Sequence, residues 1–272
     1  MQAPFRVIDT GIAEGRRNIA FDQALIDAHS AGEIPDTIRF LRFNPTALVG
    51  RHQAVGREIH VDYCRTNGIG LARRITGGGS IYFDQGQLGW ELVLHRRTLG
   101  IQGLPEISAA ICEAAAHGLQ SLGIDAQFRP RNDIEVEGRK ISGTGGFFDG
   151  DTLFFQGTLL LDSDPEDMVK ALRVPAAKLA KRKLDSAAER VVTLRQLLGD
   201  AMPDVEAAKA ALLQGFRKKL GIETSPGAVT EAEQARARQI FDDEIGTDEF
   251  VWELDDPDGD KAVSLALLNF VN

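Results

Sequence analysis

The chain has 272 residues, with 31 lysines and arginines against 40 aspartates and glutamates, so its formal net charge is −9. This length suits one large domain, or one domain with a small appendage. Apolar residues make up 43% and charged residues 26%, which is ordinary for a soluble globular protein and excludes long disorder, collagen and coiled coil. The acidic balance makes a nucleic-acid backbone a poor partner, although local basic residues can still hold a small anion.

The sequence carries no signal for export, for a membrane or for a disulfide framework. No window approaches the ~20 apolar residues of a spanning helix, and the N-terminus lacks a basic-then-apolar signal layout. Two cysteines, Cys64 and Cys112, are too few for a disulfide scaffold or a cysteine-rich zinc site. We therefore expect a cytoplasmic protein with no membrane and no nucleic-acid partner.

The first part of the chain mixes predicted strands and helices. Alternation or short apolar runs predict strands at residues 5–9, 37–43, 46–49, 70–74, 80–83 and 88–94, hairpins at 133–143 and 147–158, and a continuing strand at 159–161. Helical spacing predicts helices at 18–29, 62–66 and 107–122. Asn18 is the expected N-cap of the first helix.

The character of the chain changes at about residue 165. Helical spacing predicts helices at 165–172, 176–183, 205–220 and 230–242, before an extended piece at 249–253. Residues 255–272 are expected to be an acidic linker and a short apolar tail after a domain spanning 1–254. Strands followed by helices, without regular βαβ alternation, predict an α+β fold with a mixed β-sheet packed with helices.

A glycine-rich segment at residues 73–80 is the first candidate site. Three successive glycines can aim backbone N–H groups at one point and form an anion-binding nest, and two arginines beside them offer forked donors. The segment is neither a P-loop nor a dinucleotide fingerprint. The alternative is a turn with surface arginines; the attached polar residues favour the anion site. The residues concerned are Arg73, Arg74, Thr76, Gly77, Gly78, Gly79 and Ser80.

The hairpin at 133–143 is the second candidate site. A two-residue turn at Glu137 and Gly138 pairs Glu135 with Lys140 and Asp133 with Ser142 on one face. A lysine held by carboxylates on a strand is placed to meet a ligand phosphate or carboxylate. The alternative is a solvated cross-strand salt bridge worth about 0.2–1 kcal/mol.

The remaining reactive residues give weaker signals. The five histidines show no metal-ligand spacing, and Cys64 and Cys112 lie on predicted helices with no adjacent base. We expect both cysteines to be small core residues. Phenylalanines at 147, 148, 154 and 155 are expected in the core, or lining an apolar channel for an acyl chain.

Together these segments resemble the lipoate–protein ligase A family, within the biotin/lipoate ligase and octanoyltransferase group. The resemblance spans residues 5–198, and the 73–80 and 138–143 blocks are specific as a pair. The matching pieces, in the order of the family, are residues 18–22, 50–53, 73–84, 131–134, 138–143 and 156–160.

The resemblance implies a two-step ATP-dependent reaction with Mg²⁺. Lipoate or octanoate is activated to an acyl-adenylate, and a lysine of a lipoyl carrier protein then attacks it. Lys140 is the expected catalytic cation, and the glycine nest with its arginines is expected to hold phosphate, pyrophosphate or the acyl carboxylate. Asn132 and Asp133 are expected at the nucleotide, with Asp133 as a magnesium ligand. The expected acyl-site residues are Ser142, Gly143, Gln156 and Gly157.

Two departures from the family pattern bear on the activity. Related octanoyltransferases carry a nucleophilic cysteine near the stretch matching 131–133, where this chain has none, which favours the adenylating ligase. Fuller ligases continue into an accessory domain, for which residues 255–272 are too short. Either a separate accessory polypeptide supplies that domain, or the enzyme adenylates without it, or it accepts a preformed acyl-AMP. The alternatives are a cysteine-dependent octanoyl or lipoyl transferase and a non-catalytic acyl- or nucleotide-binding subunit.

Overall fold

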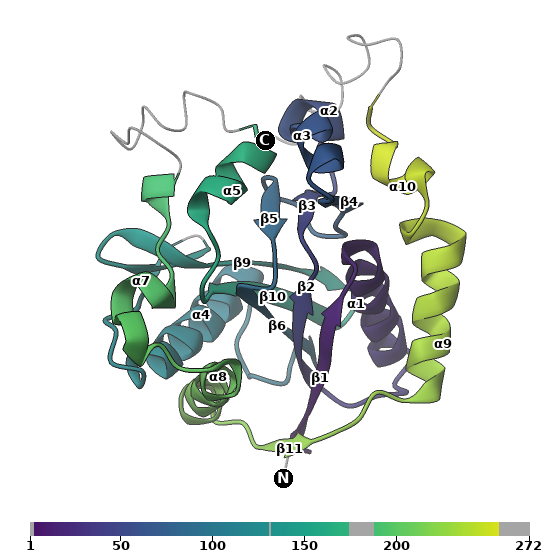
Figure 1. The fold of residues 1–272 in the computed structure, drawn as a ribbon. Helices are drawn as coiled ribbons and strands as arrows, with labels where there is room; N and C mark the ends of the chain where they lie inside the picture. The colour runs from purple at the N-terminus through teal and green to yellow at the C-terminus, as the bar shows by residue number, and fades with distance from the viewer. Residues whose placement is uncertain (1–2, 131, 174–187, 256–272) are drawn as a thin grey trace.

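A larger mixed β-sheet runs through the centre of the protein (Figure 1). The computed structural model describes residues 3–130, 132–173 and 188–255. The strand order is β11-β1-β2-β6-β10-β9-β8-β7, in which β1 pairs in parallel with β2 and β11 and the other neighbours are antiparallel. The strands are β1 (Phe5–Ala13), β2 (Thr37–Phe43), β6 (Gln87–His95), β7 (Gln127–Arg129), β8 (Asp133–Val136), β9 (Arg139–Asp149), β10 (Thr152–Leu160) and β11 (Thr224–Pro226).

A second sheet of three strands lies above the first in Figure 1. Its order is β4-β3-β5, and its strands are β3 (Thr46–Val49), β4 (Gly70–Arg73) and β5 (Ile81–Phe83). Short helices flank this small sheet: α2 (Val55–Glu58), α3 (Val61–Thr66), α5 (Pro165–Ala171) and α10 (Asp248–Trp252).

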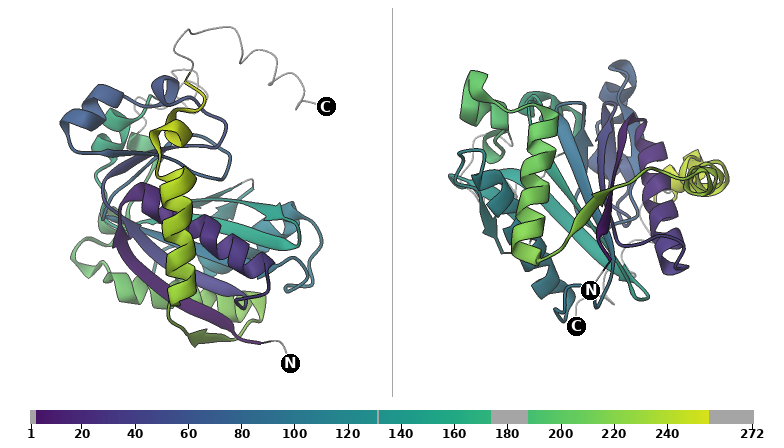
Figure 2. Two further views of the ribbon diagram at one scale, coloured as in Figure 1. Left: turned by 90° about the vertical axis from the view of Figure 1, so that its right-hand side faces the viewer. Right: turned by 90° about the horizontal axis from the view of Figure 1, so that it is seen from below.

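Long helices cover both faces of the larger sheet, as the view from below shows (Figure 2). On one face α4 (Leu104–Gln120) and α8 (Val205–Leu220) pack over Trp90 and Phe155. On the other face α1 (Gly15–Ser30) packs over Val93 and Phe154, and α9 (Glu231–Ile240) lies outside it. The remaining pieces are α7 (Leu194–Leu198), the 3₁₀ turns Ala188–Arg190 and Gly199–Ala201, and the π-helical turn Phe241–Ile245.

The α+β class and most predicted elements are confirmed. The predicted helix at 205–220 has the observed bounds, with Asp204 as N-cap and Gly221 in the left-handed C-cap position. The hairpin turn at Glu137 and Gly138 is also confirmed, since both residues adopt positive φ as a type I′ turn requires. The predicted helix at 176–183 and the tail beyond 255 lie outside the described residues.

Two local predictions are wrong. Asn18 does not cap α1; Glu14 does, and Asn18 lies buried in the second turn with its amide donating to the Arg42 carbonyl. The segment at 249–253 is not extended but forms most of α10, with Thr247 as its N-cap. Its last carbonyls are satisfied by a distant arginine, a contact that local sequence does not reveal.

The helices of the described residues include none with the length and apolar character to span a membrane.

A partly buried polar cluster around Asp36 joins the end of α1 to β2 and β6. It makes the free energy of unfolding depend on pH. Asp36 accepts hydrogen bonds from His29 at 2.9 Å, from the Thr98 hydroxyl at 2.7 Å and from the His95 amide at 2.9 Å. Burial alone raises the pKa of a carboxyl, but these donors outweigh it and hold the pKa of Asp36 below its usual value.

We expect Asp36→Asn to lower the free energy of unfolding at neutral pH by about 1–3 kcal/mol, because buried donors lose a charged acceptor. The wild-type carboxyl has a lower pKa folded than unfolded. Its stabilisation is therefore complete above the unfolded pKa and is lost as the pH falls through the folded value. Urea unfolding of both proteins at several pH values tests this. A difference that stays constant down to about pH 3 would contradict it.

Candidate functional site

A cavity of about 640 Å³ lies between the two sheets. The small sheet and residues 77–80 line one side, β2, β6, β9 and β10 line the other, and α1 and α5 contribute side chains. The lining is mixed in character, because apolar residues stand beside several charged ones. The apolar residues include Ile19, Leu41, Phe43, Leu48 and Phe83, together with Met168 and Val169 of α5 and Leu172 just after it.

Arg74 is the basic group of the glycine-rich segment that faces the cavity. Its Nε donates to the Thr76 hydroxyl at 3.0 Å, and its Nη2 donates to the carbonyls of Gly77 and Gly79 at 2.9 and 2.7 Å. Its Nη1 is buried without a hydrogen-bond partner among the described residues. Burial lowers the pKa of Arg74 to about 10, so the side chain keeps its charge at neutral pH. An unsatisfied buried donor on a cation is a ready contact for an anion.

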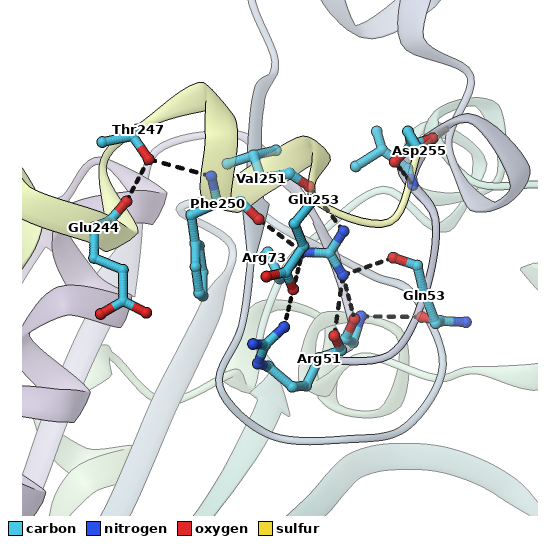
Figure 3. A network of polar contacts seen from close by, with 11 residues as sticks. Arg51, Gln53, Arg73, Glu244, Thr247, Phe250, Val251, Glu253 and Asp255 are labelled. Carbon is cyan, nitrogen blue, oxygen red and sulfur yellow. Dashed lines mark hydrogen bonds and ion pairs between the residues drawn. The ribbon is translucent and has the colours of Figure 1, made fainter. Parts of the chain in front are cut away.

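Arg73, the preceding residue, does not line the cavity. Figure 3 shows it instead among Arg51, Gln53, Phe250 and Val251. Neighbouring residues of a strand point to opposite faces, so Arg73 leaves β4 on the side away from Arg74. It is 1% exposed and donates to five backbone carbonyls, those of Gly50, Arg51 and Gln53 and those of Phe250 and Val251. The Glu253 carboxylate also lies 3.3 Å from its Nε. This corrects the expectation that Arg73 contacts the ligand.

Lys140 faces the cavity and is held by Asp133. Its Nζ lies 2.8 Å from Asp133 Oδ1, and both residues line the cavity with Asn132. The lysine folds back over Gly143, where a β-carbon would overlap the ammonium group. Gly143 is therefore required for this position of Lys140, apart from any contact it makes with a ligand.

The β8–β9 hairpin contains a bulge that the sequence does not predict. Glu135 pairs with Lys140 as predicted, but the register then shifts, so that Asp133 pairs with Gly143 and Ile134 with Ser142. The predicted pairing of Asp133 with Ser142 is therefore wrong. Ser142 turns into the core, where its Oγ is buried without a partner among the described residues, and it does not line the cavity.

Some of the other predicted residues line the cavity, and others lie behind its wall and contact the lining residues. Gln156 lines the cavity, and its amide donates to the Thr76 hydroxyl at 2.7 Å, so Thr76 supports both Gln156 and Arg74 from behind. Gly157 presents backbone because a β-carbon there would overlap the Trp90 indole. The predicted residues that do line the cavity are Arg74, Gly77, Gly78, Gly79, Ser80, Asn132, Asp133, Lys140, Gly143, Gln156 and Gly157.

A buried charged cluster on the cavity wall was not predicted. Asp22 and Glu91 line the cavity, and Arg39 Nη1 donates to Asp22 at 2.6 Å and to Glu91 at 3.1 Å. Burial raises the pKa of both carboxyls, well above the usual value for Asp22. The sequence did contain a sign of this cluster. Glu91 interrupts the apolar run of β6, and Arg39 stands between apolar residues in β2, where charged side chains are rarely buried without a partner.

Neither cysteine lines the cavity, although Cys112 contacts the lining residue Thr144 from behind. Cys64 is buried against α5, and Cys112 is buried on α4 with its sulfur 3.3 Å from the Thr144 hydroxyl. Burial raises the pKa of each thiol to about 11, which keeps both protonated at neutral pH. The expectation that both are core residues is confirmed.

The structure thus brings the glycine loop, Arg74 and the lysine–aspartate pair to one cavity between two sheets. The model of the lipoyl protein ligase A/B catalytic domain matches residues 14–217, and the chain belongs to this family.

Relatives in the family have two kinds of named activity. The octanoyltransferase LipM of Kyrpidia tusciae is 31% identical over 261 residues, covering 87% of this chain and 94% of LipM. The bipartite lipoate protein ligase of Thermoplasma acidophilum, solved in a study that includes its E2 lipoyl domain, superposes with a TM-score of 0.81 at 26% identity, covering 96% of this chain and all of that one. A lipoate-protein ligase A bound with ATP superposes with a TM-score of 0.80 at 26% identity, covering 93% and 100%.

Proposed function

We propose that this protein is an ATP-dependent lipoate–protein ligase. It would activate lipoate or octanoate to an acyl-adenylate and transfer the acyl group to a lysine of a lipoyl carrier protein. One observation carries the proposal: the described cavity presents three cationic side chains, Lys140, Arg74 and Arg190, and no thiol. Cations suit a phosphate-centred reaction, whereas a thioester mechanism needs a reactive cysteine.

In the first step a carboxylate oxygen of the fatty acid attacks the α-phosphorus of ATP. The acyl–phosphate bond forms, the bond to the β-phosphate breaks, and pyrophosphate leaves. Lys140 is placed to neutralise the charge that develops on the α-phosphate, and Asp133 orients the lysine from 2.8 Å. Arg74 Nη1 and the backbone of residues 77–79 offer donors to the phosphates or to the acyl carboxylate.

In the second step the lysine amine of the carrier attacks the acyl carbonyl carbon. The amide bond forms, AMP leaves with the bonding electron pair, and the amine loses a proton. No group of the described cavity is assigned as the base for that proton.

Magnesium enters this proposal as part of the nucleotide substrate. The described residues contain no group of three or more histidine, cysteine or carboxylate side chains that could hold a metal alone. Mg²⁺ commonly takes one or two carboxylates together with substrate phosphates, and Asp133 offers such a carboxylate on the cavity wall. Asp133 thus suits magnesium brought in with ATP.

The named relatives support the same proposal for ligands and partners. One is a ligase that binds ATP, and another is a two-part ligase studied with an E2 lipoyl domain. We infer that this chain acts on a lipoyl domain and works with a separate accessory polypeptide. Two buried free cysteines suit the reducing cytoplasm, which we propose as its location.

A mass-shift assay tests the function. The protein is incubated with ATP, lipoate or octanoate, and an apo lipoyl domain, with and without a candidate accessory polypeptide. We expect a mass gain of one acyl group that depends on ATP. A gain without ATP from an acylated carrier would favour the transferase, and ligand binding without turnover in every combination would favour a non-catalytic subunit.

The similarity to LipM makes the cysteine-dependent transferase the second candidate. We expect acyl transfer by Cys64→Ala/Cys112→Ala to stay within about threefold of wild type, since neither thiol lines the cavity and burial holds both protonated. Initial rates in the mass-shift assay measure this. Loss of transfer in the double variant, with the circular dichroism spectrum and melting temperature retained, would support the transferase instead.

A further inference from the structure

Residues 250–255, here called the strap, lie against the turn that joins β3 to α2 (Figure 3). Arg73 makes the first connection between them. Its Nη1 donates to the carbonyls of Gly50, Arg51 and Gln53 at 3.2, 3.1 and 2.6 Å. Its Nε and Nη2 donate to Phe250 and Val251 at 3.0 and 2.8 Å.

The strap holds the same turn at two further points. The Asp255 carboxylate accepts hydrogen bonds from the backbone amides of Val55 at 2.7 Å and Gly56 at 2.6 Å. It thereby caps the start of α2, whose own N-cap residue, Ala54, has no side-chain acceptor. Glu253 pairs with Arg51 and lies 3.3 Å from Arg73 Nε.

The segment from Gly50 to Glu58 in turn supports the glycine loop, residues 77–79. The Arg51 amide donates to the Thr76 carbonyl at 2.9 Å, just before the loop, and the Ser80 hydroxyl donates to Glu58 at 3.1 Å, just after it. Within the loop, the Gly78 carbonyl occupies the space of a β-carbon at Gly50. Both ends and the middle of the loop therefore rest on the segment that the strap holds.

We propose that the strap positions the glycine loop for its anionic ligand, and that Arg73 and Asp255 are the positioning residues. The ligand-binding part rests on the proposed function, and of the two anions named there it assigns the phosphates of ATP to the loop. A ligand bound by backbone N–H groups requires those groups to be fixed in advance, because ordering them on binding costs affinity. Loosening the strap should therefore weaken ATP binding more than binding of the acyl chain, which is bound mainly by apolar side chains.

The test compares Asp255→Ala, Asp255→Asn and Arg73→Lys with Asp248→Ala in the full chain. Asp248 is a matched control, since it is an aspartate of the same C-terminal region whose exposed carboxylate pairs with Arg16 instead of the turn. Hydrogen exchange followed by mass spectrometry reports the loop amides in peptides covering residues 74–81. Calorimetric titrations with ATP and with lipoate, each alone, report binding.

We expect loop exchange to accelerate about tenfold in Asp255→Ala and Arg73→Lys, the size expected from losing one helix cap. ATP affinity should fall by a similar factor and lipoate affinity by less than about twofold. Asp255→Asn keeps one acceptor oxygen, so its loop exchange and ATP affinity should lie closer to wild type than to Asp255→Ala. Asp248→Ala should match wild type in both measurements.

The proposal would be overturned if the loop amides of the strap variants exchange as slowly as those of the wild-type protein. It would also be overturned if exchange is faster but ATP affinity is unchanged. If Arg73→Lys does not fold, the two Asp255 variants decide the outcome. If the wild-type protein does not bind ATP at all, the proposed function fails, while the exchange measurement still decides whether the strap positions the loop.

Discussion

Lys140→Ala is expected to lower the initial rate of acyl transfer by about 10²–10³-fold, the usual cost of removing one preorganised charge from a transition state. Lys140 lines the cavity and has a fixed partner, Asp133, and Gly143 leaves room for it to fold back. The mass-shift assay with saturating ATP and lipoate measures the rate, and pyrophosphate release isolates the first step. Both should fall together, because the lysine acts on the α-phosphate.

Lys170→Ala is the control, since this exposed lysine of α5 pairs with Asp167 and does not line the cavity. Lys140→Arg should not restore the rate, because a planar guanidinium does not fit the space over Gly143 that the compact ammonium fills. Lys140→Ala protein that keeps more than about a tenth of the wild-type rate would contradict a charge-stabilising role.

Arg39→Met is expected to lower the free energy of unfolding by about 3–5 kcal/mol, because it leaves two buried carboxyls without their cation. Arg39 is 1% exposed and donates to Asp22, to Glu91 and, at 2.9 Å, to Asn18. Urea unfolding at neutral pH measures the loss. If the free energy of unfolding falls by less than about 1 kcal/mol, Asp22 and Glu91 do not need the positive charge of Arg39. That result is expected only if both carboxyls are protonated in the folded protein.

Asp22→Asn serves as the companion variant, because an amide resembles the protonated carboxyl. Burial raises the pKa of Asp22 above its value in the unfolded chain. Such a group stabilises the fold below the unfolded pKa and loses that contribution as the pH rises toward the folded value. We therefore expect Asp22→Asn to gain stability relative to wild type as the pH rises above about 4. A relative loss over the same range would contradict the raised pKa.

Much of the fold could be predicted from local pattern. The helix at 205–220 follows from apolar spacing between a capping aspartate and a glycine, and both signals act within the helix itself. The segment at 249–253 was predicted wrongly because a five-residue helix has little periodicity of its own. It is completed by Arg73, whose Nη2 reaches the Val251 carbonyl across 178 positions of sequence.

The candidate site could be predicted in outline, since Arg74, the glycine loop, Lys140 and Asp133 do meet in one cavity. Local pattern could not separate Arg73 from Arg74, because adjacent strand residues face opposite sides and only the packing decides which side holds the cavity. Nor could it place Ser142, because the bulge after Lys140 moves that side chain into the core.

The sequence by itself determined the α+β class, the order of the motifs and the place of Lys140 at the site, because helix periodicity, turn residues and motif spacing are properties of short segments. Only the tertiary structure decided that Arg73 holds the C-terminal strap, that Asp133 holds Lys140, and that Arg39 joins two buried carboxyls. Each of these contacts depends on burial, where a polar group without a partner is costly, and burial is set by how distant segments pack.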